Sequence, residues 1–261
     1  MKKKILIPCL LFACSLTACD DGLVTKGVAF KDANVTAIDT NVKNEKNNSF
    51  KKVKIETKVE IVITAKGNGE SLKITSETSG TFDIDLVQNT LEISMKANAK
   101  SGSTKTEAKG TVKVKKENGN IKTISSTGDA SIFKDINYND YFTTGIDNCY
   151  SWNFEINDDI IEQAASESSI SKYTAKNIVD NITENLMVDG DTAKGTFDVG
   201  IKKVVPVTIE GTTVNYNKLK YSFKDSLLQS SILGVSASAT KSGATASTTI
   251  TTESNYSYTM K

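Results

Sequence analysis

Pairs of carboxylates are the side chains whose type and spacing could support catalysis in this chain. Asp83 and Asp85 are two residues apart, and Asp158 and Asp159 are adjacent. Two facing carboxylates can act as acid and base in hydrolysis. Asp83 and Asp85, however, alternate with apolar residues among neighbouring lysines, which is typical of the solvated face of a strand. Asp158 and Asp159 open a predicted helix, where acidic groups stabilise the positive end of the helix dipole.

The basic residues limit the chemistry further. All of them are lysines, because the chain contains no His and no Arg. His supplies many general bases and metal ligands, and Arg supplies the usual clamp for phosphate and carboxylate groups. We therefore predict a protein that is not an enzyme, with no catalytic residue and no cofactor. An extracytoplasmic enzyme that uses carboxylates alone ranks last among the functional interpretations.

One segment has the spacing that opens a calcium-binding loop. Asp135, Asn137 and Asn139 are separated by single residues, as the first ligands of an EF-hand are. The rest of the loop does not follow this pattern. Asp140 stands where the loop requires Gly, and Ile146 stands where it requires a bidentate Glu. No metal ligand is therefore predicted.

The first residues have the layout of a secretion signal. Residues 2–4 are all Lys, and residues 5–16 form an apolar stretch. This stretch is shorter than the ~20 residues that a membrane-spanning helix needs. Residues 16–19 then have the sequence Leu-Thr-Ala-Cys, which places small side chains directly before Cys19. The segment therefore predicts a cleaved signal rather than a spanning helix.

The Leu-Thr-Ala-Cys run resembles the lipobox of bacterial lipoprotein precursors. The resemblance implies cleavage between Ala18 and Cys19 and attachment of diacylglycerol to the Cys19 thiol. Two acyl chains hold a soluble domain at a membrane, because each buried CH₂ contributes about 0.8 kcal/mol. We predict a signal peptide at 1–18, lipidation of Cys19, and a location on the outer face of the bacterial cell membrane. An ordinary secretory signal followed by an incidental cysteine is the alternative.

Charge and composition describe the rest of the chain. Residues 1–18 carry three Lys and no acid, so residues 19–261 have 29 basic against 31 acidic residues. No surplus of positive charge is available to bind nucleic acid. Abundant Lys, Asn and Ile indicate an AT-rich genome, which favours a Gram-positive bacterium. Cys149 is the one cysteine besides Cys19 in this part, so we expect it to be a small buried apolar residue without a disulfide.

Residues 49–261 are predicted to form a single β-rich domain behind a lipidated, polar tether at 19–48. Apolar residues alternate with Lys and Glu from Val53 to Ile63, which is typical of a strand with one face in water. Similar alternation recurs in further short segments, at 72–74, 82–86, 91–95, 108–114 and 121–124. Five or six strands joined by short turns predict an antiparallel meander.

A helical insert at about 157–188 is predicted to interrupt the strands. Its two helices are expected at about 158–167 and 171–187. Ser171 is the expected N-cap of the second helix, where four apolar residues share one face: Ala175, Val179, Ile182 and Leu186.

Strands resume after the insert, at 197–201, 205–209, 219–223 and 248–260. Pro206 indicates that the second of these is an edge strand. Residues 225–233 are expected to form a short helix or an apolar loop.

This order of elements resembles the LolA/LppX-like lipoprotein carriers over most of residues 49–261. The resemblance implies a strongly curved antiparallel sheet, a half-barrel, whose concave apolar face is covered by helices and binds acyl chains. Physical reasoning supports the fold class, because a sheet with a continuous apolar face must bury that face. We expect an α+β, mostly antiparallel fold of about ten strands, with the helical insert on the concave apolar face.

The predicted function is binding of a lipid or another apolar ligand in this half-barrel. The alternative is a non-catalytic structural or protein-interaction lipoprotein whose core is filled by its own side chains. The predicted partners are the membrane, through the diacylglyceryl anchor on Cys19, and an apolar ligand, but not nucleic acid. The apolar face supplies the candidate ligand-binding residues, which are Val59, Ile61, Ile63, Phe82, Ile84, Leu86, Ile93, Val179, Ile182 and Leu186.

Overall fold

A computed structural model describes residues 22–34, 50–67, 69–143, 145–146, 149, 171–209 and 212–261. The expected signal peptide, Cys19, and the helix expected at 158–167 lie outside these residues. Among the residues described, no helix is both long enough and apolar enough to cross a membrane.

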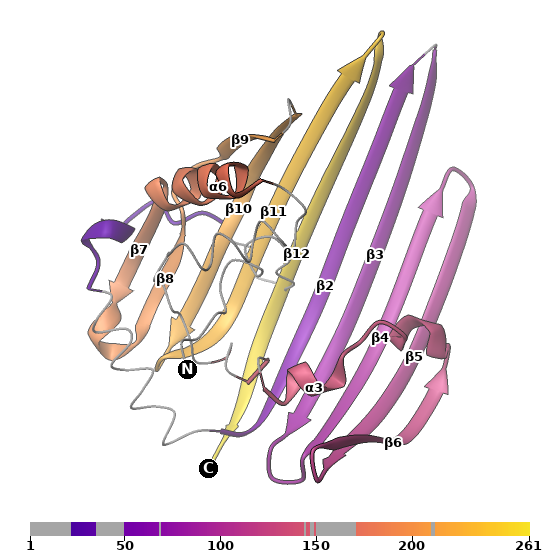
Figure 1. Ribbon diagram of the computed structural model, residues 1–261, viewed down its shortest axis with the longest axis vertical. Coiled ribbons are helices and arrows are strands. Elements are labelled where there is room, and N and C mark those ends of the chain that lie inside the picture. Colours follow the sequence, from indigo (N-terminus) through magenta and orange to yellow (C-terminus); the bar gives the residue numbers. More distant parts are fainter. Residues whose placement is uncertain are drawn as a thin grey trace.

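The described strands form one antiparallel sheet of twelve strands (Figure 1). The fold is mostly antiparallel β, as expected, and the sheet has somewhat more strands than the predicted number of about ten. The strand order is β1-β7-β8-β10-β11-β12-β2-β3-β4-β5-β6, and β9 pairs with β10. In chain order, the strands before helix α6 (Lys172–Glu184) are β1 (Val28–Ala29), β2 (Phe50–Gly67), β3 (Glu70–Asp85), β4 (Thr90–Ser101), β5 (Thr104–Glu117) and β6 (Asn120–Gly128). The strands after α6 are β7 (Leu186–Asp191), β8 (Thr196–Ile201), β9 (Val205–Ile209), β10 (Thr212–Lys224), β11 (Leu227–Lys241) and β12 (Ala244–Met260).

Short helices flank the sheet in the described part of the chain. The α-helices are α3 (Tyr138–Tyr141) and α6 (Lys172–Glu184), and the 3-10 helices are η1 (Phe30–Asp32), η3 (Ala130–Phe133) and η4 (Thr192–Lys194). Figure 1 shows α6 beside β7, β8 and β10, and α3 in front of the lower ends of the strands around β2 and β3. The two α-helices therefore lie at different parts of the sheet.

Alternation gives the sheet two different faces, as the sequence predicted. On the inner face, which the helices flank, Val53 lies opposite Ile84. The neighbouring pair on the outer face is Lys54 and Asp83. Ion pairs between β4 and β5 continue the charged surface, for example from Lys113 Nζ to Glu92 Oε2 at 3.1 Å. Successive residues of a strand point to opposite faces, so the apolar set and the charged set are separated.

The strands are longer than the sequence predicted. The segments expected as two strands at 72–74 and 82–86 are one strand, β3, and Leu86 lies just beyond its end. The link between them, residues 76–79, is polar but pairs with both β2 and β4. Ser and Thr side chains fit a pleated surface, so the ladder continues without apolar residues.

Residues 225–233, expected as a helix or a loop, form a tight turn and the start of β11. Asp225 and Ser226 both have positive φ, at 51° and 61°, and Lys224 lies opposite Leu227. Two such residues make the hairpin turn whose twist matches that of the flanking strands. The apolar run after the turn therefore belongs to a strand.

The expected N-terminus of α6 is confirmed, and its expected C-terminus is wrong. Ser171 Oγ accepts a hydrogen bond from the Thr174 N–H at 3.1 Å, which caps the helix. The helix ends at Glu184, and Leu186 begins β7 opposite Ile201. The Lys202 N–H donates to the Asn185 carbonyl at 2.9 Å. This bond uses the carbonyl that a longer helix would need, and the chain pairs with β8 instead.

Candidate functional site

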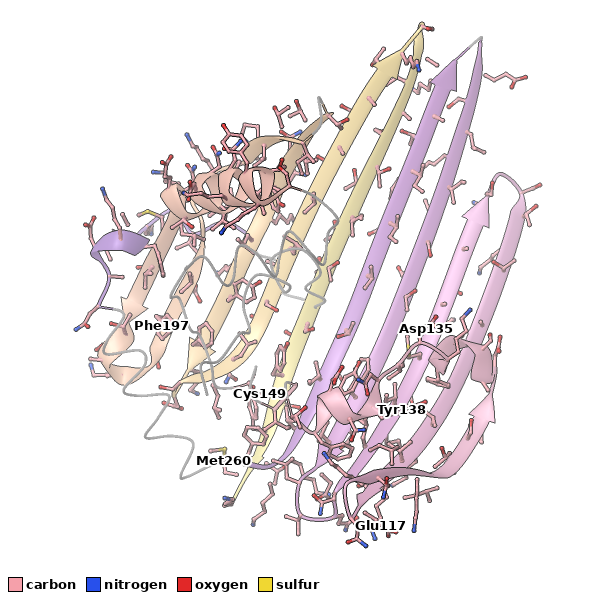
Figure 2. All side chains as sticks on the ribbon, viewed as in Figure 1. Glu117, Asp135, Tyr138, Cys149, Phe197 and Met260 are labelled. Carbon is pink, nitrogen blue, oxygen red and sulfur yellow. The ribbon has the colours of Figure 1, made fainter. Side chains whose placement is uncertain are left out.

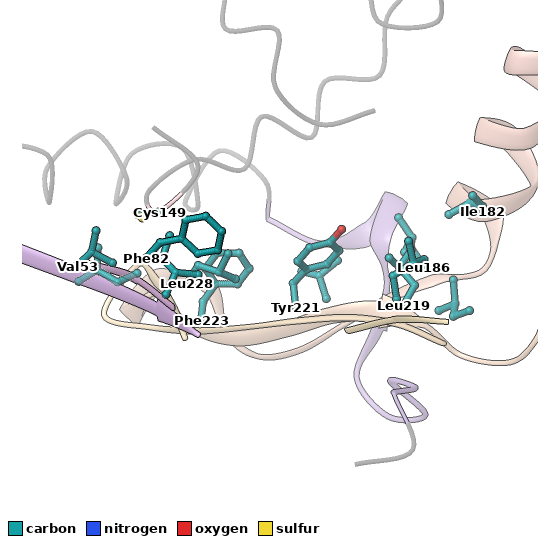
Figure 3. Close-up of a cluster of buried hydrophobic side chains, with 14 of the residues drawn as sticks. Val53, Phe82, Cys149, Ile182, Leu186, Leu219, Tyr221, Phe223 and Leu228 are labelled. Carbon is teal, nitrogen blue, oxygen red and sulfur yellow. The ribbon is translucent and has the colours of Figure 1, made fainter. Parts of the chain in front are cut away.

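The inner face is divided into two zones along the same strands. The basal core is a buried zone near one end of the strands, and it includes Val53 of β2, Phe82 of β3 and Phe223 of β10. Figure 3 shows its side chains in one layer that continues across the sheet to Leu186 and Ile182. Figure 2 shows side chains gathered over this half of the molecule and thinning toward the tips of the long hairpins.

Aromatic residues close the basal core. Phe82 stacks on Tyr141 of α3, with ring centroids 5.1 Å apart and planes 12° apart. Phe133 of η3 packs over Gly110, where a Cβ atom would come within 2.9 Å of its ring. Cys149 is buried and its thiol donates to the Gly145 carbonyl at 3.4 Å, which confirms its expected role as a small buried residue. The ring stacking and burial indicate that this zone is filled by the chain itself.

The distal face is the second zone, and it comprises Val59, Ile61, Ile63, Leu72, Ile74, Val235 and Ile250. Strand register places these residues on neighbouring strands of the inner face. Ile61 lies opposite Ile250 of β12, and Ile63 lies opposite Ile74 of β3.

Large apolar side chains of the distal face remain in contact with solvent. Ile63 is 38% exposed, Leu72 is 48% exposed and Ile250 is 39% exposed. On the same strands Ile84 and Val53 are fully buried. Single exposed apolar residues are ordinary on protein surfaces, but a contiguous group usually marks a binding surface.

Small side chains surround the distal face and leave room above it. They include Ala residues at 65, 97, 99, 108, 237, 239 and 246, on β2, β4, β5, β11 and β12. A pocket of about 650 Å³ lies at the tips of the β2–β3 and β11–β12 hairpins. Its lining combines Leu72 and four Ala residues with Glu70 and Lys241 at the rim of the sheet. Pockets of this volume hold small molecules or part of an acyl chain.

Another pocket, of about 570 Å³, has a different character. It crosses β3, β4 and β5 at the level of Gly80 and Gly110. Most of its lining side chains belong to the outer face, including Thr81, Ser94 and Lys109. The residues that line this groove are mainly Ser, Thr, Lys and Glu, so it is less suited to an apolar ligand than the distal face.

The ten residues expected to contact a ligand do not form one site. Three of them lie on the distal face: Val59, Ile61 and Ile63. Four lie in or beside the basal core near α3: Phe82, Ile84, Leu86 and Ile93. The other three are buried at the far side of the sheet, on α6 and β7: Val179, Ile182 and Leu186.

Sequence reasoning missed Leu72, Ile74, Val235 and Ile250 as members of the distal face. The alternation around residues 72–74 and 248–252 predicts strands there, but the neighbours of a strand depend on register. β2 pairs with β12, almost 200 residues away in the chain, and no local pattern indicates this pairing.

Two titratable side chains in the described part of the chain have large pKa shifts. Burial raises the pKa of Tyr216 to about 12, so this phenol stays neutral. Hydrogen bonds from Lys122 and Lys115 lower the pKa of Glu117 to about 2 on the exposed outer face. These two shifts arise from burial and from surface ion pairs.

Asp83 and Asp85 have different environments, although both were expected to be solvated. Asp83 is exposed, whereas Asp85 is buried at the end of β3. Asp85 Oδ2 pairs with Lys52 Nζ at 2.7 Å, and Oδ1 accepts the N–H groups of Val87 and Gln88 at 2.9 Å each. Hydrogen bonding to Lys52 is the main cause that lowers the pKa of Asp85. The carboxylate therefore organises the β3–β4 turn.

The segment with calcium-loop spacing also has a structural explanation. Asn137 is the N-cap of α3, and its side-chain oxygen accepts the Asn139 N–H at 3.3 Å. Its amide donates to Asp140 Oδ1 at 3.0 Å. Within the described residues, no group of three or more acidic or Cys side chains could hold a metal ion. The acids at 158 and 159 lie outside these residues.

Comparisons with known proteins give little similarity. No family model and no curated protein matches this chain. Among solved structures, a DUF1329 family protein from Desulfovibrio piger matches weakly, with 10% sequence identity and a TM-score of 0.15. That match covers 86% of this chain and 92% of the other.

Proposed function

We propose that the protein is a membrane-anchored extracytoplasmic lipoprotein that binds a lipid or another apolar ligand on the distal face. In this proposal the inner face is the concave side of a half-barrel. The observation that carries it is the exposure of Ile63 and Leu72 on β2 and β3, whose other ends carry the fully buried residues Val53 and Ile84. Ile250 on the neighbouring strand β12 is exposed beside them.

Physical chemistry supports an apolar ligand over a polar one. Covering apolar surface contributes about 25 cal/mol for each Å² removed from water. The distal face has uncharged side chains from Val59 to Ala65 along β2, whereas charged side chains lie on the other side of that strand. The hairpin-tip pocket offers space for such a ligand, with Lys241 and Glu70 near its rim.

The anchor is the second part of the proposal. The residues before Cys19 support attachment to the outer face of a bacterial membrane, and the abundance of Lys, Asn and Ile favours a Gram-positive cell. Replacing Cys19 by Ala is expected to abolish incorporation of a fatty-acid label and to release the protein from the membrane. Label that persists on this variant would contradict the anchor without affecting the ligand-binding proposal.

The alternative function is a structural or protein-interaction lipoprotein with a self-filled core. The stacking of Phe82 on Tyr141 favours this alternative for the basal half. It leaves the exposed apolar residues of the distal half unexplained.

Binding of a fluorescent fatty acid to the purified protein tests the ligand-binding proposal. Ile63→Asp places a charge on the distal face, while the matched control Val62→Asp places the same charge on the outer face of β2. We expect Ile63→Asp to weaken probe binding at least tenfold and Val62→Asp to leave it within about twofold. Native mass spectrometry should detect a bound lipid in the wild type. No bound lipid and no probe binding in the wild type would favour the structural alternative.

A further inference from the structure

The two sides of the sheet end in different ways. At one side β7 is covered by β1, which is only two residues long, and β9 carries Pro206. Short strands and Pro limit pairing with other chains. At the other side β6 runs for nine residues from Asn120 to Gly128 and contains no Pro. Within the described residues β6 pairs only with β5.

The side chains of β6 leave its free edge accessible and nearly uncharged. Residues 122–128 are all exposed, and Ile124, at a bulge opposite Lys113 and Val114, is 53% exposed. Lys122 is the only charged residue of the strand, and its Nζ pairs with Glu117 Oε2 at 2.8 Å. The strand therefore lacks the unpaired charges that commonly prevent association at sheet edges.

Ladder geometry identifies which backbone groups are free. The Asp129 N–H donates to the Lys109 carbonyl at 2.9 Å. Bonded and non-bonded pairs alternate along an antiparallel ladder, so the pair Val112 and Ser126 is non-bonded. The N–H and C=O of Ser126 consequently point away from β5, toward the free edge.

We propose that β6 is a self-association edge, at which β6 of a second copy of this chain adds antiparallel. A second copy suits this edge because it brings an equally uncharged strand of equal length. Lys122 is the only charged residue of β6, so like charges oppose each other only in the one register that pairs Lys122 with Lys122 of the second copy. The twofold axis of an antiparallel pair is perpendicular to the sheet, so both inner faces lie on the same side and form one surface.

The size of the edge sets the strength of the interaction. A nine-residue strand pair buries less than the roughly 1,200 Å² of a standard interface. The dimer is therefore weak, and its population rises with protein concentration. This association does not depend on ligand binding to the distal face.

Sedimentation velocity of the purified full chain over a wide concentration range tests the proposal. The wild type is expected to shift from monomer to dimer as its concentration rises. Ser126→Pro removes the outward N–H and fills the edge with a ring, and should raise the dimer dissociation constant at least tenfold. The matched control Ser126→Ala retains the backbone and should dimerise as the wild type does. Circular dichroism verifies that each variant is folded.

A second variant decides the matter if Ser126→Pro does not fold. Ile124→Lys adds a charge at the exposed bulge, and it should weaken the dimer while Ile124→Thr does not. Hydrogen exchange should also slow in β6 as concentration rises, but not in β9. A wild type that stays monomeric throughout, or a dimer unaffected by Ser126→Pro or Ile124→Lys, would overturn the proposal.

Discussion

The basal core and the distal face lie on the same inner side of the same strands, yet only the first is buried. Val53 and Ile84 form a fully buried cross-strand pair near one end of β2 and β3. Ten residues further along β2, Ile63 pairs with Ile74 and remains 38% exposed. Both pairs follow the same period-two pattern, so alternation determines which face a residue occupies but not whether that face is covered.

Side-chain size and cover distinguish the two regions. The basal core has large rings, including Phe82 and Phe223, and helical segments such as α3 lie over part of it. Around the distal face the sequence supplies mainly Ala, Ser and Thr. A region that is packed by its own side chains should respond to mutation through stability, whereas an open face should respond through binding.

The largest difference is expected between Ile84→Asp and Ile63→Asp. Ile84 has no exposed surface, so an Asp there buries a charge without a partner and should cost about 4 kcal/mol or more. At Ile63 the carboxylate reaches water, and the loss should be about 1 kcal/mol. Urea unfolding followed by circular dichroism measures both. Equal losses would remove the distinction between the two regions.

A core truncation at the other side of the sheet should have the next largest effect. Ile182 of α6 is 1% exposed, so Ile182→Ala leaves a cavity and should destabilise by about 2–5 kcal/mol. Tyr173 on the same helix is 80% exposed and serves as the control, because Tyr173→Ala should cost no more than about 0.5 kcal/mol. Thermal melting of both variants checks this. A small loss at Ile182, with stronger probe binding, would mean that α6 covers a ligand pocket instead of a core.

A moderate, pH-dependent effect is expected at the basal turn between β3 and β4. Asp85→Asn removes the ion pair to Lys52 and should cost about 1–3 kcal/mol at neutral pH. The pKa of Asp85 is lowered in the folded state, so its contribution is present above the unfolded pKa and is lost as pH falls through the folded value. The difference between wild type and variant should shrink steadily in urea titrations at pH 7, 5 and 3. A difference that grows on acidification would contradict this assignment.

Much of the fold follows from local patterns. Alternation predicts the strand faces, and Ser171 predicts the start of α6. These features depend on neighbouring residues, whose spacing is visible in the sequence. Pro206, expected at an edge, does lie in β9, which pairs only with β10 among the described strands.

Features that depend on distant partners could not be predicted in this way. Leu186 continues the helical pattern of α6, but pairing with Ile201 places it in β7. The polar residues 76–79 suggest a break, yet β2 and β4 on both sides keep them in one strand. Asp85 resembles Asp83 in the sequence, and only the turn geometry makes it buried.

The candidate site shows the same limit. The expected set of ten residues was chosen by apolar character, and that choice merged core positions such as Ile84 with open positions such as Ile63. What separates them is the cover, which includes Tyr141 over Phe82. A ligand face is therefore recognised by apolar residues that remain exposed after folding, and exposure depends on tertiary packing.

The smallest effect is expected on the outer face, where Lys58→Ser removes an ion pair to Glu77. The Nζ–Oε2 distance is 2.9 Å, but the two side chains are 35% and 45% exposed. Water and salt screen such a pair, and its formation restricts two flexible side chains, so the loss should stay below about 0.5 kcal/mol. A double-mutant cycle with Glu77→Gln at low and high salt isolates the pair, and the coupling should fall as salt rises.

Because Lys58 points away from the distal face, the variant should also bind the fluorescent fatty acid as the wild type does. A loss comparable to that of Ile84→Asp, or weaker probe binding, would mean that the outer face is packed or contributes to the site, and the contrast between the two faces of β2 would then fail.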